Sequence, residues 1–337
     1  MSAADASMTS RPDRQGKASP RVAVVGAGYW GKNLVRNFAE LGALAAVVDA
    51  DEAQAQSLAA QFGCAVAGAD AVLADPAIAA VAIAAPAALH FRLASAALEA
   101  GKHVYVEKPL ALTVADGQTL VALAERHRRV LMVGHLLRYH AAFLKLQDLV
   151  REGRLGALRY LRSSRMNFGK LRREEDVLWS FAPHDISMVL ALVGEEPKTV
   201  AASAVYALGN DNADVCTVDL GFSGALRAQV AASWVNPTKE QKLVVVGSEA
   251  MAVFDDLASW ERKIMLYPHK VAWNGDVPVA KPAEGVPVPL TQSEPLRAEC
   301  RHFIDCVVSG ETPRTDGREG LAVLSVLARA SDAMRAS

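Results

Sequence analysis

Short apolar runs alternate with amphipathic stretches along the first 140 residues. The run Val22–Val25 predicts a buried strand, and the stretch 31–41 places its apolar side chains on one helical face. The same alternation predicts further strands at 44–48, 80–84, 103–106 and 130–133, and helices at 51–61, 88–100 and 113–127. Regular alternation of this kind is typical of a parallel sheet with helices on both faces. Residues 20–140 are therefore predicted to form a doubly wound α/β domain.

The pattern changes after residue 140. A helix is predicted at 141–152 and a long strand at 157–165, and a later helix at 183–193. Strands then follow one another with only turns between them, at 199–207, 215–222, 226–234, 242–246 and 250–254. A Pro-rich stretch at 268–295 leads to two final helices at 294–309 and 317–336. Successive strands without helices predict an open, mostly antiparallel sheet, so residues 141–337 are expected to form an α+β substrate domain.

Composition narrows the class of protein. The 337 residues are 51% hydrophobic, which excludes a mainly disordered chain, although residues 1–19 are predicted to be a disordered tail. Lys and Arg number 36 against 37 Asp and Glu, so bulk charge argues against a nucleic-acid or membrane partner and favours a small molecule. No run reaches the roughly 18 apolar residues of a membrane span, and the N-terminus lacks the apolar stretch of a signal peptide.

The cysteine and histidine spacing bears on compartment and metals. Cys64, Cys216, Cys300 and Cys306 are widely separated and form no CxxC pair. This spacing predicts reduced thiols in a reducing, cytoplasmic compartment rather than a disulfide framework. No cluster of His, Cys and acids has ligand spacing, so no metal is expected.

A glycine motif follows the first predicted strand. Gly26, Gly28 and Gly31 match G-x-G-x-x-G, with Tyr29 and Trp30 between them, and the motif opens a helix. In this context the first glycine permits a tight turn, the second admits a pyrophosphate, and the third lets helix pack on strand. The helix N-terminus then faces the anion.

The second predicted strand ends in Asp49, about 20 residues beyond the glycines. A carboxylate there can accept hydrogen bonds from ribose hydroxyls and repels a 2′-phosphate. Asp51 is expected instead to cap the next helix. NAD is therefore the predicted cofactor rather than NADP.

Lys108 comes just past the carboxyl end of the predicted strand 103–106. Ligands of open α/β sheets bind at this edge, and Pro109 biases Lys108 away from helical geometry. Taken alone, a lysine before a proline is usually a solvated loop residue.

The surrounding motifs resemble those of the Gfo/Idh/MocA oxidoreductase family. They are AAPAALH at 84–90, ALEAGKHV at 97–104, EKPL at 107–110, Gly134-His135, and, near the C-terminus, Glu299, Phe303 and PRTDG at 313–317. The resemblance implies a Rossmann domain, a C-terminal domain whose sheet often forms dimers or tetramers, and nicotinamide chemistry on sugars or cyclitols. In that family the lysine of EKP, here Lys108, is catalytic. Motif and resemblance together assign these residues to the cofactor: Gly26, Gly28, Tyr29, Trp30, Gly31, Asp49, Ala85, Pro86, His90, Glu107 and Lys108.

A narrower resemblance concerns the substrate. The segments 165–167, 178–187 and 232–234, with Pro237, are similar to a bacterial subgroup that oxidises carbon 3 of an N-acetylglucosamine unit in a nucleotide sugar. Neighbouring subgroups act on inositols, free sugars and other nucleotide sugars. A non-catalytic, dinucleotide-binding regulator on the same fold is the third alternative.

His184 is the candidate base. Oxidation of a secondary alcohol releases a proton, and histidine has a suitable pKa to accept it. With Pro183 as the first residue of the predicted helix, His184 would lie in the first turn, where the helix dipole disfavours imidazolium. Asp185 would lie in the same turn, where its carboxylate is expected to interact favourably with the helix dipole. The family usually has Asp four residues before the histidine, and this chain has Ser180 there.

Further polar residues flank the two catalytic candidates. Arginine binds phosphates bidentately and a tryptophan face stacks on sugars or bases, so this region suits an anionic nucleotide sugar. Lys170, Arg172 and Arg173 are at least as well explained as a solvated loop paired with residues 174–176. The residues assigned to the substrate are Arg138, Tyr139, Arg165, Asn167, Trp179, Ser180 and Asp185.

Overall fold

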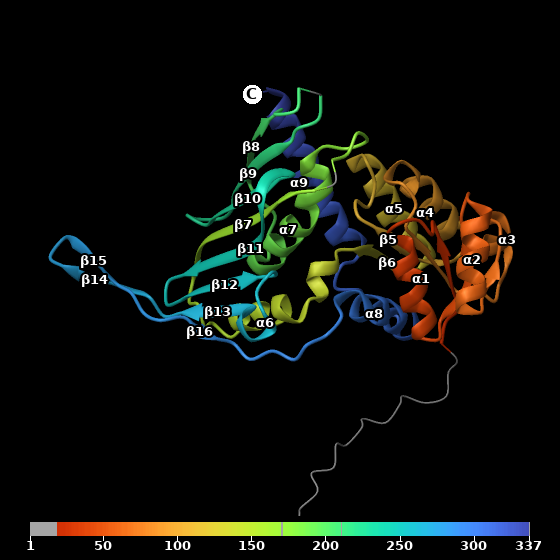
Figure 1. The fold of residues 1–337 in the computed structure, drawn as a ribbon, viewed down its shortest axis with the longest axis horizontal. Helices are drawn as coiled ribbons and strands as arrows, with labels where there is room; N and C mark the ends of the chain where they lie inside the picture. The colour runs from red at the N-terminus through yellow and green to blue at the C-terminus, as the bar shows by residue number, and fades with distance from the viewer. Residues whose placement is uncertain (1–18, 170, 210, 337) are drawn as a thin grey trace, which may run out of the picture.

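The computed structural model describes residues 19–169, 171–209 and 211–336 and contains two large sheets and a separate two-stranded hairpin (Figure 1). The predicted disordered tail falls almost entirely outside the described residues. The predicted fold class, a parallel α/β sheet followed by a large and mostly antiparallel one, is confirmed. None of the described helices is long and apolar enough to cross a membrane.

The first sheet has six parallel strands in the order β3-β2-β1-β4-β5-β6. The strands are β1 Val22–Val25, β2 Leu44–Val48, β3 Ala65–Val66, β4 Ala80–Ile83, β5 His103–Glu107 and β6 Leu131–Gly134, and the helices are α1 Gly31–Glu40, α2 Glu52–Phe62, α3 Ala69–Ala74, α4 His90–Glu99 and α5 Val114–His127. The strand order reverses between β1 and β4. Ligands of doubly wound sheets bind in the crevice at such a reversal.

The second sheet has eight strands in the order β16-β13-β12-β11-β7-β10-β9-β8. They are β7 Leu158–Phe168, β8 Thr199–Val205, β9 Val215–Gly221, β10 Arg227–Ser233, β11 Val235–Gly247, β12 Met251–Asp255, β13 Ile264–Tyr267 and β16 Val286–Pro287. Only the β7–β10 pair in this sheet is parallel among the described strands.

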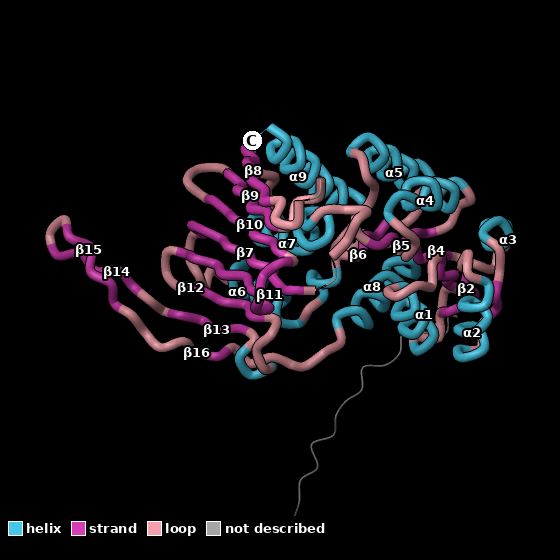
Figure 2. Tube along the Cα trace, turned by 45° about the horizontal axis from the view of Figure 1, so that its top comes forward, coloured by secondary structure: helices cyan, strands magenta, loops and turns pink. Residues whose placement is uncertain are grey.

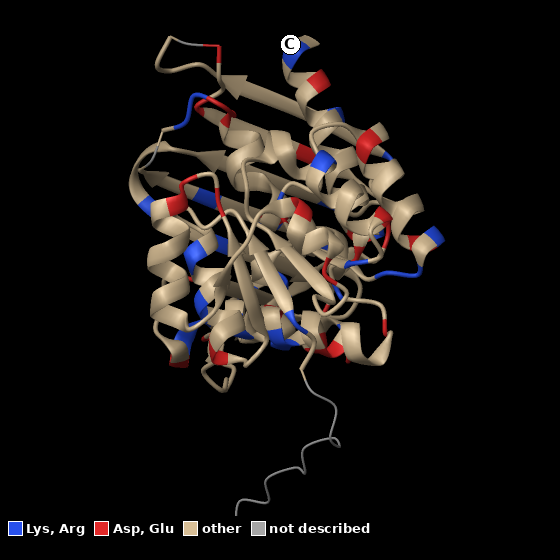
Figure 3. Cartoon of the chain, turned by 90° about the vertical axis from the view of Figure 1, so that its right-hand side faces the viewer, with Lys and Arg blue, Asp and Glu red and all other residues tan. Residues whose placement is uncertain are grey.

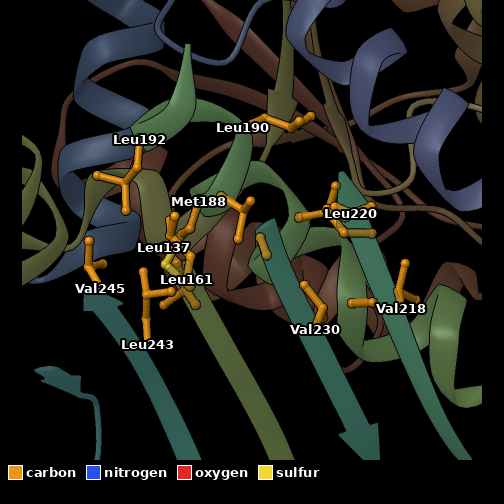
Figure 4. Packing of buried hydrophobic residues seen from close by; sticks show 14 of the residues in the cluster. Leu137, Leu161, Met188, Leu190, Leu192, Val218, Leu220, Val230, Leu243 and Val245 are labelled. Atoms are coloured by element: carbon orange, nitrogen blue, oxygen red, sulfur yellow. The ribbon is translucent and has the colours of Figure 1, made fainter. Parts of the chain in front are cut away.

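Helices α6 Ala141–Arg151, α7 Val177–Val193 and α9 Gly317–Ala336 lie beside this sheet, with α7 on β7 and β10 and α9 on β8 (Figures 1 and 2). Alternate strand residues such as Leu161, Val230 and Leu243 point into one apolar core with Met188 of α7 (Figure 4). Burial of this core holds α7, and the site residues it carries, rigidly on the sheet.

Helix α8, Pro295–Ser309, follows the second sheet in the chain but packs on the first one. Its Phe303 ring lies 6.3 Å from Phe38 of α1 and 5.9 Å from Tyr105 of β5, both edge-to-face. Residues beyond 294 therefore complete the core of the N-terminal half. The division of the chain into two domains at residue 140 stays a prediction.

A long hairpin was not expected from the Pro-rich stretch at 268–295. Strands β14 Lys270–Asn274 and β15 Val277–Lys281 pair only with each other and project from the body of the molecule (Figures 1 and 2). The short β3 and α3 were also missed. Strand β3 has two exposed residues, and only Val72 of the six residues of α3 is buried, so neither element shows a hydrophobic pattern.

The predicted helix start at Pro183 is wrong. Helix α7 begins at Val177, capped by Asp176, whose side chain accepts from the Trp179 amide at 3.1 Å. Pro183 lies inside the helix, where it removes one backbone hydrogen bond. Burial of most of the helix outweighs the loss of this hydrogen bond. The preference of proline for the first turn of a helix therefore indicated the wrong boundary. His184 therefore lies mid-helix.

Candidate active site

The glycine turn after β1 leaves room for a ligand. A Cβ on Gly26, whose φ is +88°, would lie 2.6 Å from the Ala85 amide, and a Cβ on Gly31 would lie 1.9 Å from the Gly26 carbonyl oxygen. By contrast, a Cβ on Gly28 would meet no described heavy atom within 4 Å. The first and third glycines are thus required by close packing, and the second faces open space. This fits a pyrophosphate approaching the loop.

Asp49 lies beside this turn, at the end of β2. Its carboxylate accepts hydrogen bonds from the Ala27 amide at 2.5 Å and the Asp51 amide at 2.9 Å. The Asp51 side chain caps α2, as expected, by accepting from the Gln54 amide. Asp49 therefore fixes the glycine turn while its remaining lone pairs can accept from ribose hydroxyls.

His90 joins two turns at the carboxyl edge of the sheet. Its ring nitrogens lie 2.7 Å from the Pro109 carbonyl oxygen and 2.9 Å from the Ala85 carbonyl oxygen, and the side chain is 1% exposed. It thus links the EKP turn to the segment that contains Ala85 and Pro86. Both ring nitrogens face backbone carbonyl oxygens, and a contact of His90 with the cofactor stays a prediction.

Glu107 connects the EKP motif to the glycine turn. Trp30 donates from Nε1 to Glu107 Oε1 at 2.6 Å, while the neighbouring Tyr29 is 82% exposed. This contact spans 77 residues of sequence and places the two motifs side by side.

The ammonium of Lys108 reaches helix α7. Lys108 donates from Nζ to the Ser180 carbonyl oxygen at 2.8 Å. Burial lowers the pKa of Lys108 below its ordinary value, and the nearby Glu175 and Glu107 carboxylates oppose that shift. Ser180 and His184 are one helical turn apart, so this bond brings Lys108 to the helix face that carries His184.

His184 is held in its neutral form. Burial, and then the positive charges of Lys108 and Arg165, lower the pKa of His184 well below its usual value. Its Nδ1 is buried and accepts no hydrogen bond from any described residue. The predicted neutrality of the ring thus has a different cause from the one expected, because desolvation and neighbouring cations replace the dipole of a helix N-terminus.

Polar atoms without a partner gather around these two residues. Among the described residues, buried side-chain atoms lacking a hydrogen bond include Asn167 Oδ1, Arg172 Nε, Ser180 Oγ and His184 Nδ1. All four lie on β7, on α7 or on the segment between them. Buried polar groups are almost always satisfied, so such a group of open donors and acceptors suits a polar ligand.

The two arginines assigned to the substrate are paired within the chain. Arg165 contacts Asp185 at 2.6 Å and Arg138 contacts Glu319 at 3.1 Å. Arg172 contacts Glu175 at 3.0 Å, in agreement with a loop whose cations pair with residues 174–176. Acidic and basic residues are interspersed along the helices and strands (Figure 3).

The expected dipole role of Asp185 is wrong. This carboxylate is 1% exposed, lies mid-helix, and accepts hydrogen bonds from Ser163 at 2.5 Å and from Arg165. It orients Arg165 on β7.

Two aromatic residues assigned to the substrate are engaged in packing. The Tyr139 side chain is 1% exposed, and its hydroxyl lies 3.2 Å from Thr315 Oγ1. Trp179 is half-buried and donates from Nε1 to Ser331 of α9 at 2.9 Å. Their roles in substrate binding stay predictions.

Sequence reasoning missed the acid that orients His135. Glu319 of α9 lies 2.7 Å from His135 Nδ1, and the His135 and His184 rings are 6.3 Å apart. Burial raises the pKa of Glu319, but His135 and Arg138 outweigh that effect and leave the pKa below its usual value. No local pattern could reveal a contact between residues 184 positions apart.

A cavity of about 650 Å³ lies away from these groups. It is lined by His103 and Leu131, at the starts of β5 and β6, and by Arg318. This is the opposite edge of the sheet from Lys108, which follows β5. The volume of this cavity is therefore no guide to the position of the active site.

Taken together, the glycine turn, the acid after β2 and the lysine after β5 define a dinucleotide-dependent oxidoreductase. Two family profiles match the chain: "Oxidoreductase family, NAD-binding Rossmann fold" over residues 20–135, and "GFO/IDH/MocA C-terminal domain" over residues 143–253. The chain belongs to the Gfo/Idh/MocA family, binds NAD and is a dehydrogenase.

Several relatives resemble nearly the whole chain. UDP-N-acetylglucosamine 3-dehydrogenase from Acidithiobacillus ferrooxidans is 31% identical over 307 residues, which cover 90% of this chain and 94% of that protein. Its solved structure has a TM-score of 0.83, with 94% and 97% of the two chains covered at 29% identity. Inositol 2-dehydrogenase from Rhizobium meliloti is 25% identical over 300 residues, covering 84% and 86%. A levoglucosan dehydrogenase complex with NADH shares the fold, with a TM-score of 0.78 at 21% identity and 94% and 97% coverage.

Proposed function

We propose that this enzyme oxidises carbon 3 of a UDP-N-acetylglucosamine-type nucleotide sugar to a 3-keto sugar. The observation that carries the catalytic part is the bond from Lys108 to the Ser180 carbonyl, which places an ammonium one helical turn from a neutral histidine. The substrate part is supported by the similarity to the Acidithiobacillus enzyme over nearly the full length.

Lys108 stabilises the developing negative charge in this proposal. Its ammonium donates a hydrogen bond to the reacting hydroxyl as that oxygen loses its proton. Because the site is desolvated, a fixed positive charge there acts more strongly than it would in water. NAD, when bound, supplies the electron-pair acceptor.

His184 takes the proton of the hydroxyl on a ring nitrogen. The depressed pKa keeps that nitrogen unprotonated at neutral pH, and none of the described residues competes for Nδ1. Ser180 carries no charge, so it does not raise the basicity of His184 as a carboxylate would. Its unpartnered hydroxyl is available for a hydrogen bond to the sugar.

The arginines that would bind the diphosphate of a nucleotide sugar already form ion pairs with acidic residues of the chain. A nucleotide sugar would have to share Arg165 or Arg172 with Asp185 or Glu175, whereas a neutral cyclitol needs no such exchange. This pairing, together with the inositol dehydrogenase relative, favours inositol or free-sugar oxidation as the second candidate. A regulator without chemistry is disfavoured, because Lys108 and His184 are both in place.

A substrate panel separates these candidates. We expect NADH absorbance to rise with UDP-N-acetylglucosamine or its uronic acid, and to stay at background with myo-inositol and free N-acetylglucosamine. NADH formation with inositol alone would overturn the substrate assignment and leave the catalytic assignment standing. No NADH with any alcohol in the panel would favour the regulator.

We also propose a homo-oligomer formed through the C-terminal sheet. Helices α6, α7 and α9 lie on one face, while the other face has a hollow lined by Val244, Val253 and Met265. On the projecting hairpin, Trp273 is 68% exposed. Light scattering is expected to give at least twice the chain mass of 35.8 kDa. A monomer at micromolar concentration would contradict this proposal.

A further inference from the structure

The buried Glu299 and the partly buried Glu107 share one tyrosine hydroxyl behind Lys108. The Tyr105 hydroxyl lies 3.0 Å from Glu107 Oε1 and 3.1 Å from Glu299 Oε2. Tyr105 and Glu299 are both 0% exposed. A phenol has a single proton and can donate it to only one of the two carboxyl groups. The second contact is a hydrogen bond only if a carboxyl group itself carries a proton.

The surroundings decide which carboxyl group carries that proton. Burial raises the pKa of Glu107 as well, but Glu107 also accepts from Trp30 Nε1, and that bond and the positive charge of Lys108 favour its ionised form. Glu299 has no comparable partner, and its Oε1 has no hydrogen bond to any described residue. The ionised form is therefore far more costly at Glu299 than at Glu107.

The other titratable groups near Glu299 act in the same direction. Burial raises the pKa of Glu299 well above its usual value, and the negative charges of Glu107 on β5 and Glu319 on α9 add to that shift, while the hydrogen bond with Tyr105 opposes it without cancelling it. Cys300, the next residue on α8, has its thiol pKa raised by burial and by nearby acids that include Glu107, so it contributes no charge.

We propose that Glu299 is a positioning residue that remains a neutral carboxylic acid, donates to Tyr105, and thereby aims the Tyr105 proton at Glu107. Glu107 in turn holds Trp30 in the glycine turn, so the chain of bonds fixes the pyrophosphate loop to the end of β5. This role of Glu299 goes beyond the proposed function, because it concerns the binding of the dinucleotide and not the sugar that is oxidised.

The packing of β6 supports a fixed geometry for this chain of bonds. A Cβ on Gly134 would lie 2.7 Å from the Tyr105 hydroxyl oxygen and 2.9 Å from Glu107 Oε2. A larger residue at this position would therefore have to displace the Tyr105 hydroxyl or the Glu107 carboxylate.

The protonation state is tested by stability against pH. An acid whose pKa is higher in the folded than in the unfolded state is most favourable to folding below its unfolded pKa, and this contribution is lost as pH rises towards the folded pKa. Glu299→Gln replaces the acid with a neutral group that does not titrate. We therefore expect its melting temperature, relative to wild type, to rise between pH 5 and pH 8. A difference that stays constant or falls with pH would show that Glu299 is ionised, and would overturn the proposal.

The positioning role is tested by NADH affinity, measured by fluorescence titration without any sugar. Glu299→Gln is expected to bind NADH within about twofold of wild type, whereas Glu299→Ala and Tyr105→Phe weaken binding about tenfold. Ile304→Val, a buried change on the same helix, controls for altered packing. Equal losses in the Gln and Ala variants, or none in Tyr105→Phe, would overturn the proposal. Failure to oxidise any sugar would leave both readouts intact.

Discussion

Replacing Lys108 with Met should lower kcat by about 10²–10³-fold, the usual loss when one donor to a developing oxyanion is removed. Methionine has a similar length but has no charge and no donor for the Ser180 carbonyl or the substrate hydroxyl. The binding of NADH should change far less, because the glycine turn and Asp49 are untouched. Initial rates at saturating NAD and nucleotide sugar measure the effect.

A matched control lies just before the same strand. Lys102 is 5% exposed and donates from Nζ to two backbone carbonyl oxygens, Asp75 at 2.6 Å and Ile78 at 2.9 Å. Lys102→Met removes a buried ammonium from the same domain and should reduce stability without a comparable loss of kcat. If Lys108→Met kept wild-type turnover, or if both variants lost it equally, a specific catalytic role for Lys108 would be ruled out.

Replacing His184 with Asn should reduce kcat/KM by about 10²–10⁴-fold, the range for a missing general base. The pH profile of the wild type gives a second readout. Because burial and neighbouring cations lower the pKa of His184 well below 6.5, the base stays neutral as pH falls from 8 to 6. No decline attributable to His184 is therefore expected in that interval, and its acidic limb should lie lower.

His127 provides the control for this variant, since it lies in the last turn of α5 away from the site. His127→Asn should retain wild-type kcat/KM. An acidic limb centred at or above 6.5 that disappears in His184→Asn would contradict the desolvated environment described above. Wild-type kcat/KM in His184→Asn would remove the histidine from the mechanism.

The local sequence was enough to predict five of the six strands of the first sheet and its dinucleotide turn. Gly26 and Gly31 are required by close packing and Gly28 leaves the loop open to a ligand, as the motif predicts, and the capping role of Asp51 was also predictable from the local sequence. The start of α7 could not be predicted from the local sequence, because the burial that stabilises a helix with an internal proline comes from the sheet beneath it.

The substrate side shows a second limit of sequence reasoning. Arg138 and Arg165 are cationic in the sequence, but Glu319 and Asp185 neutralise them in the fold. The same applies to Tyr105 and Glu299, which are 194 residues apart and meet only when α8 returns to the first sheet. Long-range pairing of charges cannot be derived from spacing along the chain.

Ser180 separates this chain from the usual family pattern. An aspartate there would place a carboxylate beside Lys108 and raise the basicity of His184. With serine, the histidine is a weaker base, and more of the barrier must be lowered by the Lys108 ammonium.

The most direct measurement uses UDP-N-acetylglucosamine deuterated at carbon 3. The proposed function predicts that the reduced cofactor gains one mass unit by mass spectrometry, and that the rate falls relative to the unlabelled sugar if transfer is limiting. Unlabelled NADH formed from this substrate would place the oxidation at another carbon. The absence of any reduced cofactor would contradict the assignment of this nucleotide sugar altogether.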